Sequence, residues 1–266
     1  MGIQKMMEGP ALLKVSHLCT SFHTGSRKVT AVDDVSIEVK PQQIVALVGE
    51  SGSGKSVTAM SILGLVDPPG IIESGEIRLG CNNLLECSSR QLRKLRGTEM
   101  AVIFQDPMNA LNPVLTIGRQ LMETIMLHKR VSGKEAKALA LRQMQQAGLA
   151  EPERLFNKYP FQISGGMCQR VMIAIALVSG ARLLIADEPT TALDVTIQAQ
   201  ILKELDRIRW ENHVGILLIT HDLGVVAELA DYVYVMKSGK IVESGNVFEL
   251  FSNPVHPYTK YLMECR

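Results

Sequence analysis

A glycine-rich stretch near residue 50 constrains this chain more than any other feature of its sequence. Residues 49–56 read Gly-Glu-Ser-Gly-Ser-Gly-Lys-Ser and fit the phosphate-binding pattern Gly, four residues of any type, then Gly-Lys-Ser or Gly-Lys-Thr. The pattern would arise by chance in roughly one in a hundred chains of this length. Because a glycine-rich structural turn is the alternative, the flanking residues have to decide between the two.

The flanks of this stretch favour a nucleotide site. Residues 43–48 are mostly apolar and predict a buried strand, and residues 57–63 predict the start of a helix. In this setting backbone N–H groups converge on phosphates, and the helix N-terminus adds its positive dipole end. Lys55 would reach the β- and γ-phosphates, and Ser56 would ligate Mg²⁺. The expected contacts with a nucleotide are Gly49, Ser51, Gly52, Ser53, Gly54, Lys55, Ser56 and Val57.

Polar residues end three further predicted strands. An apolar strand over residues 182–188 ends in Asp187 and Glu188, and another over residues 215–222 has a polar tip that contains His221. A strand over residues 101–105 ends on Gln105. In open parallel sheets ligands bind at the carboxyl ends of strands, so the first two strands are expected to lie beside the one that carries the glycine loop.

A second anion-binding segment lies further along the chain. Ser164, Gly165 and Gly166 precede a predicted helix over residues 168–178, and a serine and two glycines at a helix N-terminus form a nest for an anion. Residues 116–148 are predicted as two helices separated near residues 132–135. Because this helical stretch interrupts the alternation of strands and helices, we expect a helical subdomain inserted over about residues 106–172.

The N-terminal part predicts an antiparallel sheet, with short alternating strands between residues 12 and 39. Phe22 is an isolated aromatic residue there, where its ring could stack on an adenine base or pack against the sheet. A net charge of +1 gives no electrostatic case for nucleic acid. No window approaches the roughly 20 apolar residues of a membrane span. Five scattered cysteines without a C-x-x-C pair argue against disulfides and structural zinc.

From about residue 11 onward the chain resembles the nucleotide-binding subunits of ATP-binding cassette (ABC) transporters. The family's elements occur in its order: the glycine loop, the glutamine loop at Gln105, the signature at 164–167, Asp187-Glu188, then Ala192-Leu193-Asp194 and His221. The resemblance implies an α/β fold with a P-loop NTPase (RecA-like) core, an antiparallel β subdomain and the helical insertion. The ATPase domain would cover residues 11–255, and residues 256–266 would form a short tail.

The resemblance implies a role for each site residue. Glu188 would polarise the water that attacks the γ-phosphorus, and Asp187 would hold Mg²⁺ through water. Gln105 and His221 would contact the metal, the water or the γ-phosphate. In the family two cassettes face each other, so Ser164, Gly165, Gly166 and Asp194 would serve a nucleotide at the interface.

Narrower features resemble the peptide and nickel importer branch, notably residues 104–113, 186–194 and the His-Pro-Tyr-Thr segment at 256–259. Met167 and Cys168 depart from the wider family's signature without removing its serine or glycines. Many peptide importers continue into a cysteine-rich tail that resembles an iron–sulfur ligand set. Here only Cys265 follows, so no cluster is expected and the cargo leans slightly toward nickel or metal complexes.

The implied partners are a second ABC ATPase subunit, two transmembrane permease subunits and, indirectly, an extracytoplasmic solute-binding protein. The subunit would be peripheral at the cytoplasmic face of the cell membrane. Two alternatives remain from the residues: a soluble non-transport ABC ATPase acting in DNA repair or translation, and a P-loop kinase. No internal repeat or heptad array supports the first, and the kinase leaves the Ser164 segment and His221 unexplained.

Overall fold

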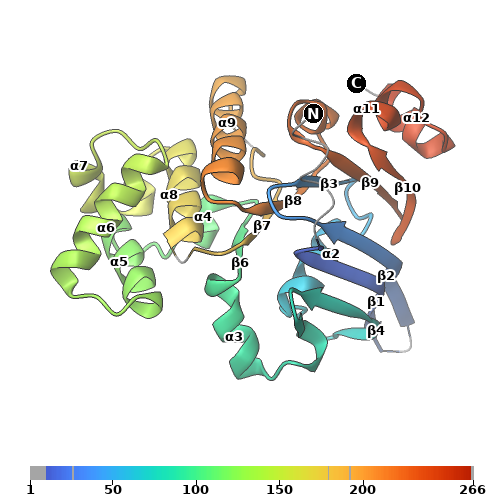
Figure 1. The fold of residues 1–266 in the computed structure, drawn as a ribbon, viewed down its shortest axis with the longest axis horizontal. Helices are drawn as coiled ribbons and strands as arrows, with labels where there is room; N and C mark the ends of the chain where they lie inside the picture. The colour runs from blue at the N-terminus through green and yellow to red at the C-terminus, as the bar shows by residue number, and fades with distance from the viewer. Residues whose placement is uncertain (1–9, 26, 179, 192, 265–266) are drawn as a thin grey trace.

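The computed structural model describes residues 10–264 except residues 26, 179 and 192. Within these residues two sheets and a block of helices lie side by side, as Figure 1 shows. In the described residues no helix is both long enough and apolar enough to span a bilayer. The α/β fold class predicted from the sequence is confirmed, because both a parallel and an antiparallel sheet are present.

The larger sheet has six strands in the described residues, in the order β10-β9-β3-β8-β7-β6. Strands β6, β7, β8, β3 and β9 run parallel to one another, and β10 pairs antiparallel with β9. The strands are β3 (Ile44–Val48), β6 (Met100–Ile103), β7 (Leu183–Asp187), β8 (Gly215–Thr220), β9 (Tyr232–Lys237) and β10 (Lys240–Asn246).

The strand order corrects one expectation. Strand β8 lies beside β3 as predicted, but β7 does not, because β8 separates the two and β9 occupies the other side of β3. Strands β3, β7 and β8 are buried along their whole length. Continuous apolar runs of this kind mark a strand with both faces covered, and they carry no information about its neighbours.

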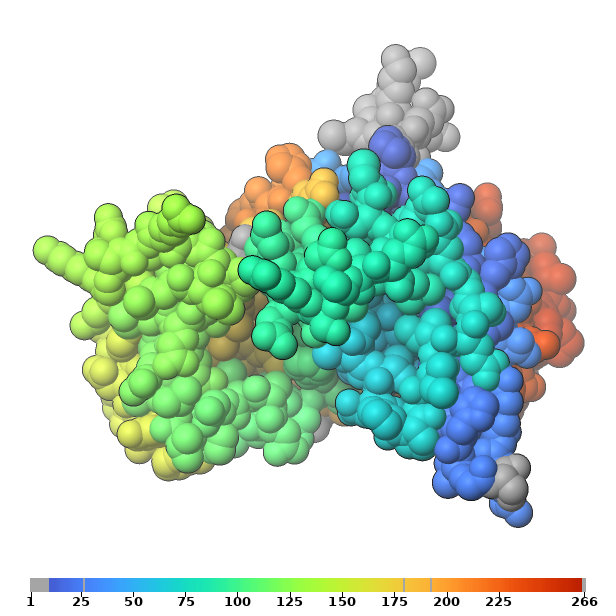
Figure 2. Space-filling model, turned by 90° about the horizontal axis from the view of Figure 1, so that it is seen from below, coloured from blue at the N-terminus to red at the C-terminus, as the bar shows by residue number. Residues whose placement is uncertain are grey.

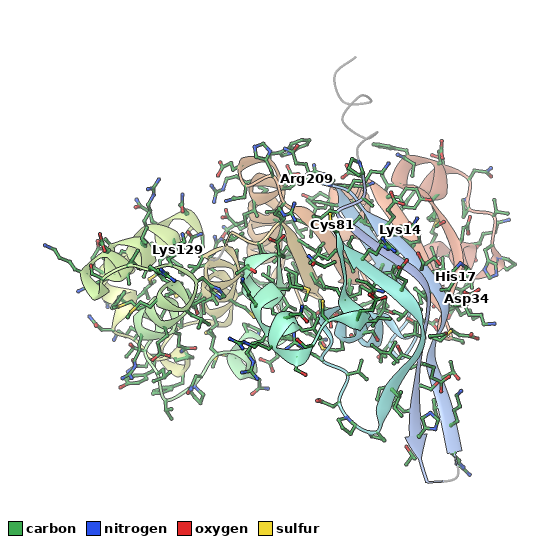
Figure 3. All side chains as sticks on the ribbon, turned by 60° about the horizontal axis from the view of Figure 1, so that its bottom comes forward. Lys14, His17, Asp34, Cys81, Lys129 and Arg209 are labelled. Carbon is green, nitrogen blue, oxygen red and sulfur yellow. The ribbon has the colours of Figure 1, made fainter. Side chains whose placement is uncertain are left out.

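A second sheet covers one face of the first and has the order β2-β1-β4-β5, all antiparallel. Its strands are β1 (Leu13–Thr24), β2 (Arg27–Val39), β4 (Gly70–Leu79) and β5 (Asn82–Asn83). His17 and Asp34 mark irregular pairing between β1 and β2, where both residues have positive φ and Nδ1 of the histidine lies 2.7 Å from Oδ1 of the aspartate (Figure 3).

The helices divide between the large sheet and a separate block. Those near the sheets are α2 (Lys55–Leu63), η1 (Leu84–Glu86), α3 (Ser89–Thr98), α9 (Val195–Glu211), α10 (Leu223–Leu229), α11 (Val247–Ser252) and α12 (Pro257–Glu264). The block contains α4 (Pro107–Ala110), α5 (Ile117–His128), α6 (Gly133–Gln146), α7 (Pro152–Phe156), η2 (Pro160–Gln162) and α8 (Gly165–Val178). Pro107 begins the short helix α4, and the Asp106 side chain caps it by accepting the N–H groups of Met108 and Asn109.

Three apolar clusters hold these layers together. On one face of the large sheet the cluster joins alternate strand residues such as Val48 and Ala186 to α9 and α10. On the other face residues such as Leu47 and Ile185 pack with α2 and the antiparallel sheet. A third cluster lies within the helical block and draws on α5, α6 and α8. Helix α8 contributes to the first cluster and to the third, so it connects the block to the large sheet.

Candidate functional site

The glycine loop joins β3 to α2, and the backbone around it explains its glycines. Gly49 and Gly54 have φ values of 155° and 109°, which side-chain-bearing residues rarely adopt. A Cβ atom would lie 2.2 Å from the carbonyl oxygen of Met236 at Gly49, and 2.3 Å from that of Ala31 at Gly54. The loop is therefore pressed against β9 and β2 at two points, and only glycine fits at either.

Lys55 lies inside this loop and is 5% exposed. Its Nζ donates hydrogen bonds to the carbonyl oxygens of Gly49 at 2.8 Å and Glu50 at 2.9 Å. Burial lowers the pKa of Lys55, while the carboxylates of Glu188, Asp187 and Glu50 act to raise it. The ammonium group is thus held by the loop that it would serve, within the influence of three carboxylates.

Other loop residues offer donors to a ligand. Ser51, Gly52 and Ser56 are exposed, whereas Ser53 is 5% exposed. Among the described residues Ser53 Oγ has no hydrogen-bond partner, and a buried hydroxyl without a partner is costly unless a ligand or water completes it. An anion held by the loop and by the start of α2 would supply that partner. Val57 is half-buried and packs into the core below the loop.

Asp187 and Ser56 make a site whose chemistry fits Mg²⁺. Ser56 Oγ, in the first turn of α2, donates to Asp187 Oδ1 at the end of β7 at 3.3 Å. The two meet although β8 lies between β7 and β3, the strand that leads into the glycine loop. Asp187 is 5% exposed and burial raises its pKa, with the Glu188 carboxylate adding to the rise and Ser56 and Lys55 opposing it. A hydroxyl and one carboxylate, completed by substrate phosphates and water, is an oxygen set that Mg²⁺ accepts.

Glu188 follows β7 directly and has a strained backbone, with φ of 47°. Its carboxylate accepts hydrogen bonds from Gln105 Nε2 at 2.8 Å and Thr191 Oγ1 at 2.8 Å, and lies 3.0 Å from His221 Nδ1. Burial acts to raise the pKa of Glu188, but the hydrogen bonds with Thr191 and His221 and the charges of His221 and Lys55 outweigh it, and the pKa lies below its usual value. The carboxylate is therefore ionised at neutral pH.

These side chains share one cavity of about 500 Å³. Its described lining residues are Gly49, Glu50, Ser51, Gln105, Glu188, Thr191, His221, Leu223, Tyr261 and Leu262. The structure thus brings the start of the glycine loop to the three residues predicted as catalytic. The strand order is compatible with this meeting, because the carboxyl ends of β3, β8, β7 and β6 lie along one edge of the sheet.

The predicted signature residues do not line this cavity in the part of the chain that the structure describes. Ser164 and Gly165 are exposed at the start of α8, and Ser164 Oγ accepts the N–H of Met167 at 3.4 Å. A Cβ atom at Gly166 would lie 2.8 Å from the Ile197 side chain, so the signature borders the start of α9. Asp194 caps that helix by accepting the N–H of Ile197 at 3.0 Å, and Ala192 lies outside the described residues.

Phe22 lies on β1, opposite Val29 on β2 and Gly70 on β4. Its ring is half-buried, and a Cβ atom at Gly70 would lie 2.8 Å from Phe22 Cε1. One edge of the ring therefore packs against Gly70. Phe22 is not among the described residues that line the cavity. Stacking on an adenine remains a prediction for this residue.

Several residues at the site were not singled out from the sequence. Thr191 bonds to Glu188, Tyr258 bonds to the glycine loop, and Tyr261 and Leu262 line the cavity. The only available signals were the run of residues 186–194 and the His-Pro-Tyr-Thr segment, which were interpreted as branch markers. Nothing in the spacing of residues 256–262 relative to the glycine loop indicates that the two meet, because over 200 residues separate them.

Comparison with known proteins gives the same assignment. Residues 32–191 match a family model described as ABC transporter. The oligopeptide transport ATP-binding protein AppD of Bacillus subtilis is 49% identical over 253 residues, which are 95% of this chain and 77% of that protein. The peptidoglycan transport ATP-binding protein YejF of Agrobacterium fabrum is also 49% identical over 95% of this chain, and the chain spans 46% of its length.

A solved structure shares the fold. The dimeric structure of a post-hydrolysis state of the ATP-binding cassette MJ0796, bound to ADP and Pi, superposes with a TM-score of 0.80 at 27% identity. The match covers 88% of this chain and 98% of that one. The predicted P-loop NTPase fold and the predicted family are both confirmed. The chain therefore belongs to the ABC transporter family and has the fold of its ATP-binding cassettes.

Proposed function

We propose that this chain is the ATP-hydrolysing subunit of an ABC importer and that it powers uptake of di- or oligopeptides. The observation that carries the proposal is the cavity where the glycine loop meets Gln105, Glu188 and His221. A phosphate-binding loop beside an ionised carboxylate provides both a place for a nucleotide triphosphate and a base for water. Two relatives at 49% identity are named as transport ATP-binding proteins.

In the proposed reaction the loop from Gly49 to Ser56, with Val57 behind it, would bind the phosphates of ATP. Phe22 would stack on the adenine. Lys55 would leave its two loop carbonyls and contact the β- and γ-phosphates. The exchange is favourable because a buried ammonium group is stabilised by a charged partner. Ser56 and Asp187 would hold Mg²⁺, with Gln105 as a further ligand, and the metal would offset phosphate charge.

Glu188 would accept the proton of the attacking water. Three partners hold its carboxylate: Gln105 and Thr191 donate to Oε2, and His221 lies against Oε1. Because a carboxylate has about four acceptor positions, the water could take the remaining one on Oε1, and Gln105 and His221 would turn to the metal, the water or the γ-phosphate. Thr191 would keep the carboxylate oriented, because it follows Glu188 within the same turn.

A second cassette would complete the site. Ser164, Gly165 and Gly166 lie away from the cavity of their own chain, so their exposed N-terminal turn is available to an ATP held by a partner. Asp194 borders the same surface through Ile197. The solved relative MJ0796 is a dimer bound to ADP and Pi, which supports this arrangement. We propose that the partner is a different but related chain.

The two permease subunits would dock on the groove between the helical block and the body of the protein. This groove has a volume of about 650 Å³, is mainly apolar, and is bordered by α3, α5 and α8. Figure 2 shows a hollow between the block and the α3 region on this face. Phe104 and Leu111 contribute to it from either side of Gln105, so a docked permease segment could act on the catalytic residues. The chain would then lie at the cytoplasmic face of the membrane and receive cargo indirectly from a solute-binding protein.

Peptides are a better candidate cargo than nickel. The expectation from the sequence leans toward nickel or metal complexes, and Cys265 lies outside the described residues. The relative AppD is named for oligopeptides, covers 95% of this chain at 49% identity, and its name mentions no metal. A cassette does not contact its cargo, so no single segment of its sequence specifies that cargo. The similarity over nearly the whole chain to a named relative is therefore the stronger argument.

Uptake measurements test the proposal directly. Cells that carry the intact chain, or Glu188→Gln, would be supplied with a labelled oligopeptide and, separately, with labelled nickel. Loss of peptide uptake alone in the variant supports the proposal. Loss of nickel uptake alone overturns the cargo, and no loss of either overturns the transport function. Glu228→Gln, an exposed change on α10, is the matched control.

A further inference from the structure

The C-terminal helix α12 touches the nucleotide loop. The phenol oxygen of Tyr258 accepts a hydrogen bond from the backbone N–H of Glu50 at 3.0 Å, across 208 positions of the sequence. Tyr258 is 4% exposed, and burial raises its pKa, so the hydroxyl is protonated and neutral. Both residues fall in described parts of the chain, but Tyr258 lies outside the span matched by the family model, residues 32–191.

The segment that carries Tyr258 is fixed independently of the loop. The Glu243 carboxylate on β10 accepts the backbone N–H groups of Val255 at 2.7 Å and His256 at 2.9 Å. His256 Nδ1 accepts the N–H of Tyr258 at 3.1 Å, and the Lys237 ammonium lies 4.5 Å from the centre of the Tyr258 ring. The hydroxyl is thus presented to the loop by a structure anchored on β9 and β10.

The contact is one step away from the phosphate-binding lysine. Glu50 donates its N–H to Tyr258, and the carbonyl oxygen of the same residue accepts from Lys55 Nζ at 2.9 Å. Hydrogen bonds at both the N–H and the carbonyl oxygen of Glu50 thus fix the loop between β3 and the phosphate-binding glycines. The next turn of α12 also approaches the site, since Tyr261 and Leu262 line the cavity that contains Glu188 and His221.

We propose that Tyr258 is a positioning residue for the nucleotide loop and that residues 256–262 are a working part of the ATP site rather than a trailing tail. The proposal rests on the proposed function, because it assumes that the loop binds ATP. Without the hydroxyl, the Glu50 N–H loses its partner and the loop gains freedom that ATP binding must remove. The effect is expected on ATP affinity more than on turnover.

The test compares two single-atom deletions in the full-length chain. Tyr258→Phe removes the hydroxyl and keeps the ring. Tyr234→Phe is the matched control, because the Tyr234 hydroxyl also accepts a backbone N–H, that of Glu38 at 3.2 Å, and burial raises its pKa as well. The Tyr234 pair joins β9 to β2, and neither residue lines the described cavity. Both variants would be compared for thermal unfolding, for the Kd of Mg-ATP, and for the KM and kcat of hydrolysis.

We expect Tyr258→Phe to raise the Kd and KM for Mg-ATP about fivefold or more, the effect of leaving one donor unpaired, with kcat within about twofold. Tyr234→Phe should lower thermal stability about as much as Tyr258→Phe does, but it should leave Kd and KM unchanged. Unchanged Kd and KM in Tyr258→Phe, or an equal change in both variants, would overturn the positioning role. If the unmodified chain itself neither binds nor hydrolyses ATP, the proposed function fails instead.

Discussion

Gln105 donates a hydrogen bond from Nε2 to Oε2 of Glu188 at 2.8 Å, joining a residue two positions past the end of β6 to the residue that follows β7. Gln105 belongs to the segment that leads into the helical block, whereas Glu188 directly follows β7 of the large sheet. Any movement of the block that displaces Gln105 therefore alters the environment of the carboxylate. This contact would connect the proposed permease groove to Glu188, the proposed base.

Replacing Glu188 by Gln should stop hydrolysis without stopping ATP binding. The amide keeps the shape of the side chain and its contacts with Gln105 and Thr191 but cannot accept a proton, and loss of a general base costs about 10²- to 10⁴-fold in rate. Single-turnover hydrolysis and an equilibrium ATP-binding measurement would check this. A variant that turns over ATP at the normal rate would show that another group is the base.

Replacing Asp187 by Asn should separate metal binding from folding. Burial raises the pKa of Asp187 above its unfolded value, so its contribution to stability is present at low pH and is lost as pH rises through the folded pKa. At pH 7 the buried charge is a cost, and the nucleotide-free variant should unfold at a Tm equal to or above that of the unmodified chain. The difference in Tm between the variant and the unmodified chain should shrink as pH falls toward 4.

The same variant should lose its response to magnesium. With ATP at about 100 times its Kd, the unmodified chain should gain about 2.7 kcal/mol of stability, and part of that gain should depend on Mg²⁺. Calorimetry with and without Mg²⁺ would check whether Asp187→Asn abolishes the metal-dependent part. A full metal-dependent gain in the variant would mean that Asp187 is not a ligand.

The glycine loop offers a paired stability test. Gly52→Ala introduces a Cβ atom with nothing within 4 Å, so it should cost only the positive φ of 79°, about 1–2 kcal/mol. Gly54→Ala adds a collision at 2.3 Å with the carbonyl of Ala31 to a φ of 109°, and should cost several times more. Urea unfolding of both nucleotide-free variants measures the difference. Equal costs would show that β2 gives way at Ala31.

Sequence reasoning succeeded where a feature depends on the local backbone around a few neighbouring residues. The glycines at 49 and 54, the carboxylates at the end of β7 and the serine that precedes α8 all follow from local geometry, and the family pattern gave their order. It did not succeed where distant segments meet. The order of β3, β8 and β7 depends on packing between equally apolar strands, and the contact between Tyr258 and Glu50 depends on how β9 and β10 carry the chain back to the loop.

The signature segment can be tested with charge. Gly165 begins α8 and is exposed, and a Cβ atom there would have nothing within 4 Å. Gly165→Asp should preserve the fold, because an acidic residue in the first turn of a helix is favourable. Gly133→Asp is the matched control, since Gly133 begins α6 and is equally exposed and unhindered.

If Gly165 meets the nucleotide of a partner cassette, the new carboxylate would face the γ-phosphate of that ATP across the interface. Placing like charges together there should cost several kcal/mol. Hydrolysis at the partner's site in the assembled complex should fall by about 100-fold or more, while ATP binding by the isolated variant chain stays unchanged. The Gly133→Asp variant should hydrolyse normally. Normal hydrolysis with Gly165→Asp would place the signature outside the interface, and weakened ATP binding by the isolated chain would mean that Ser164 to Gly166 act on their own nucleotide.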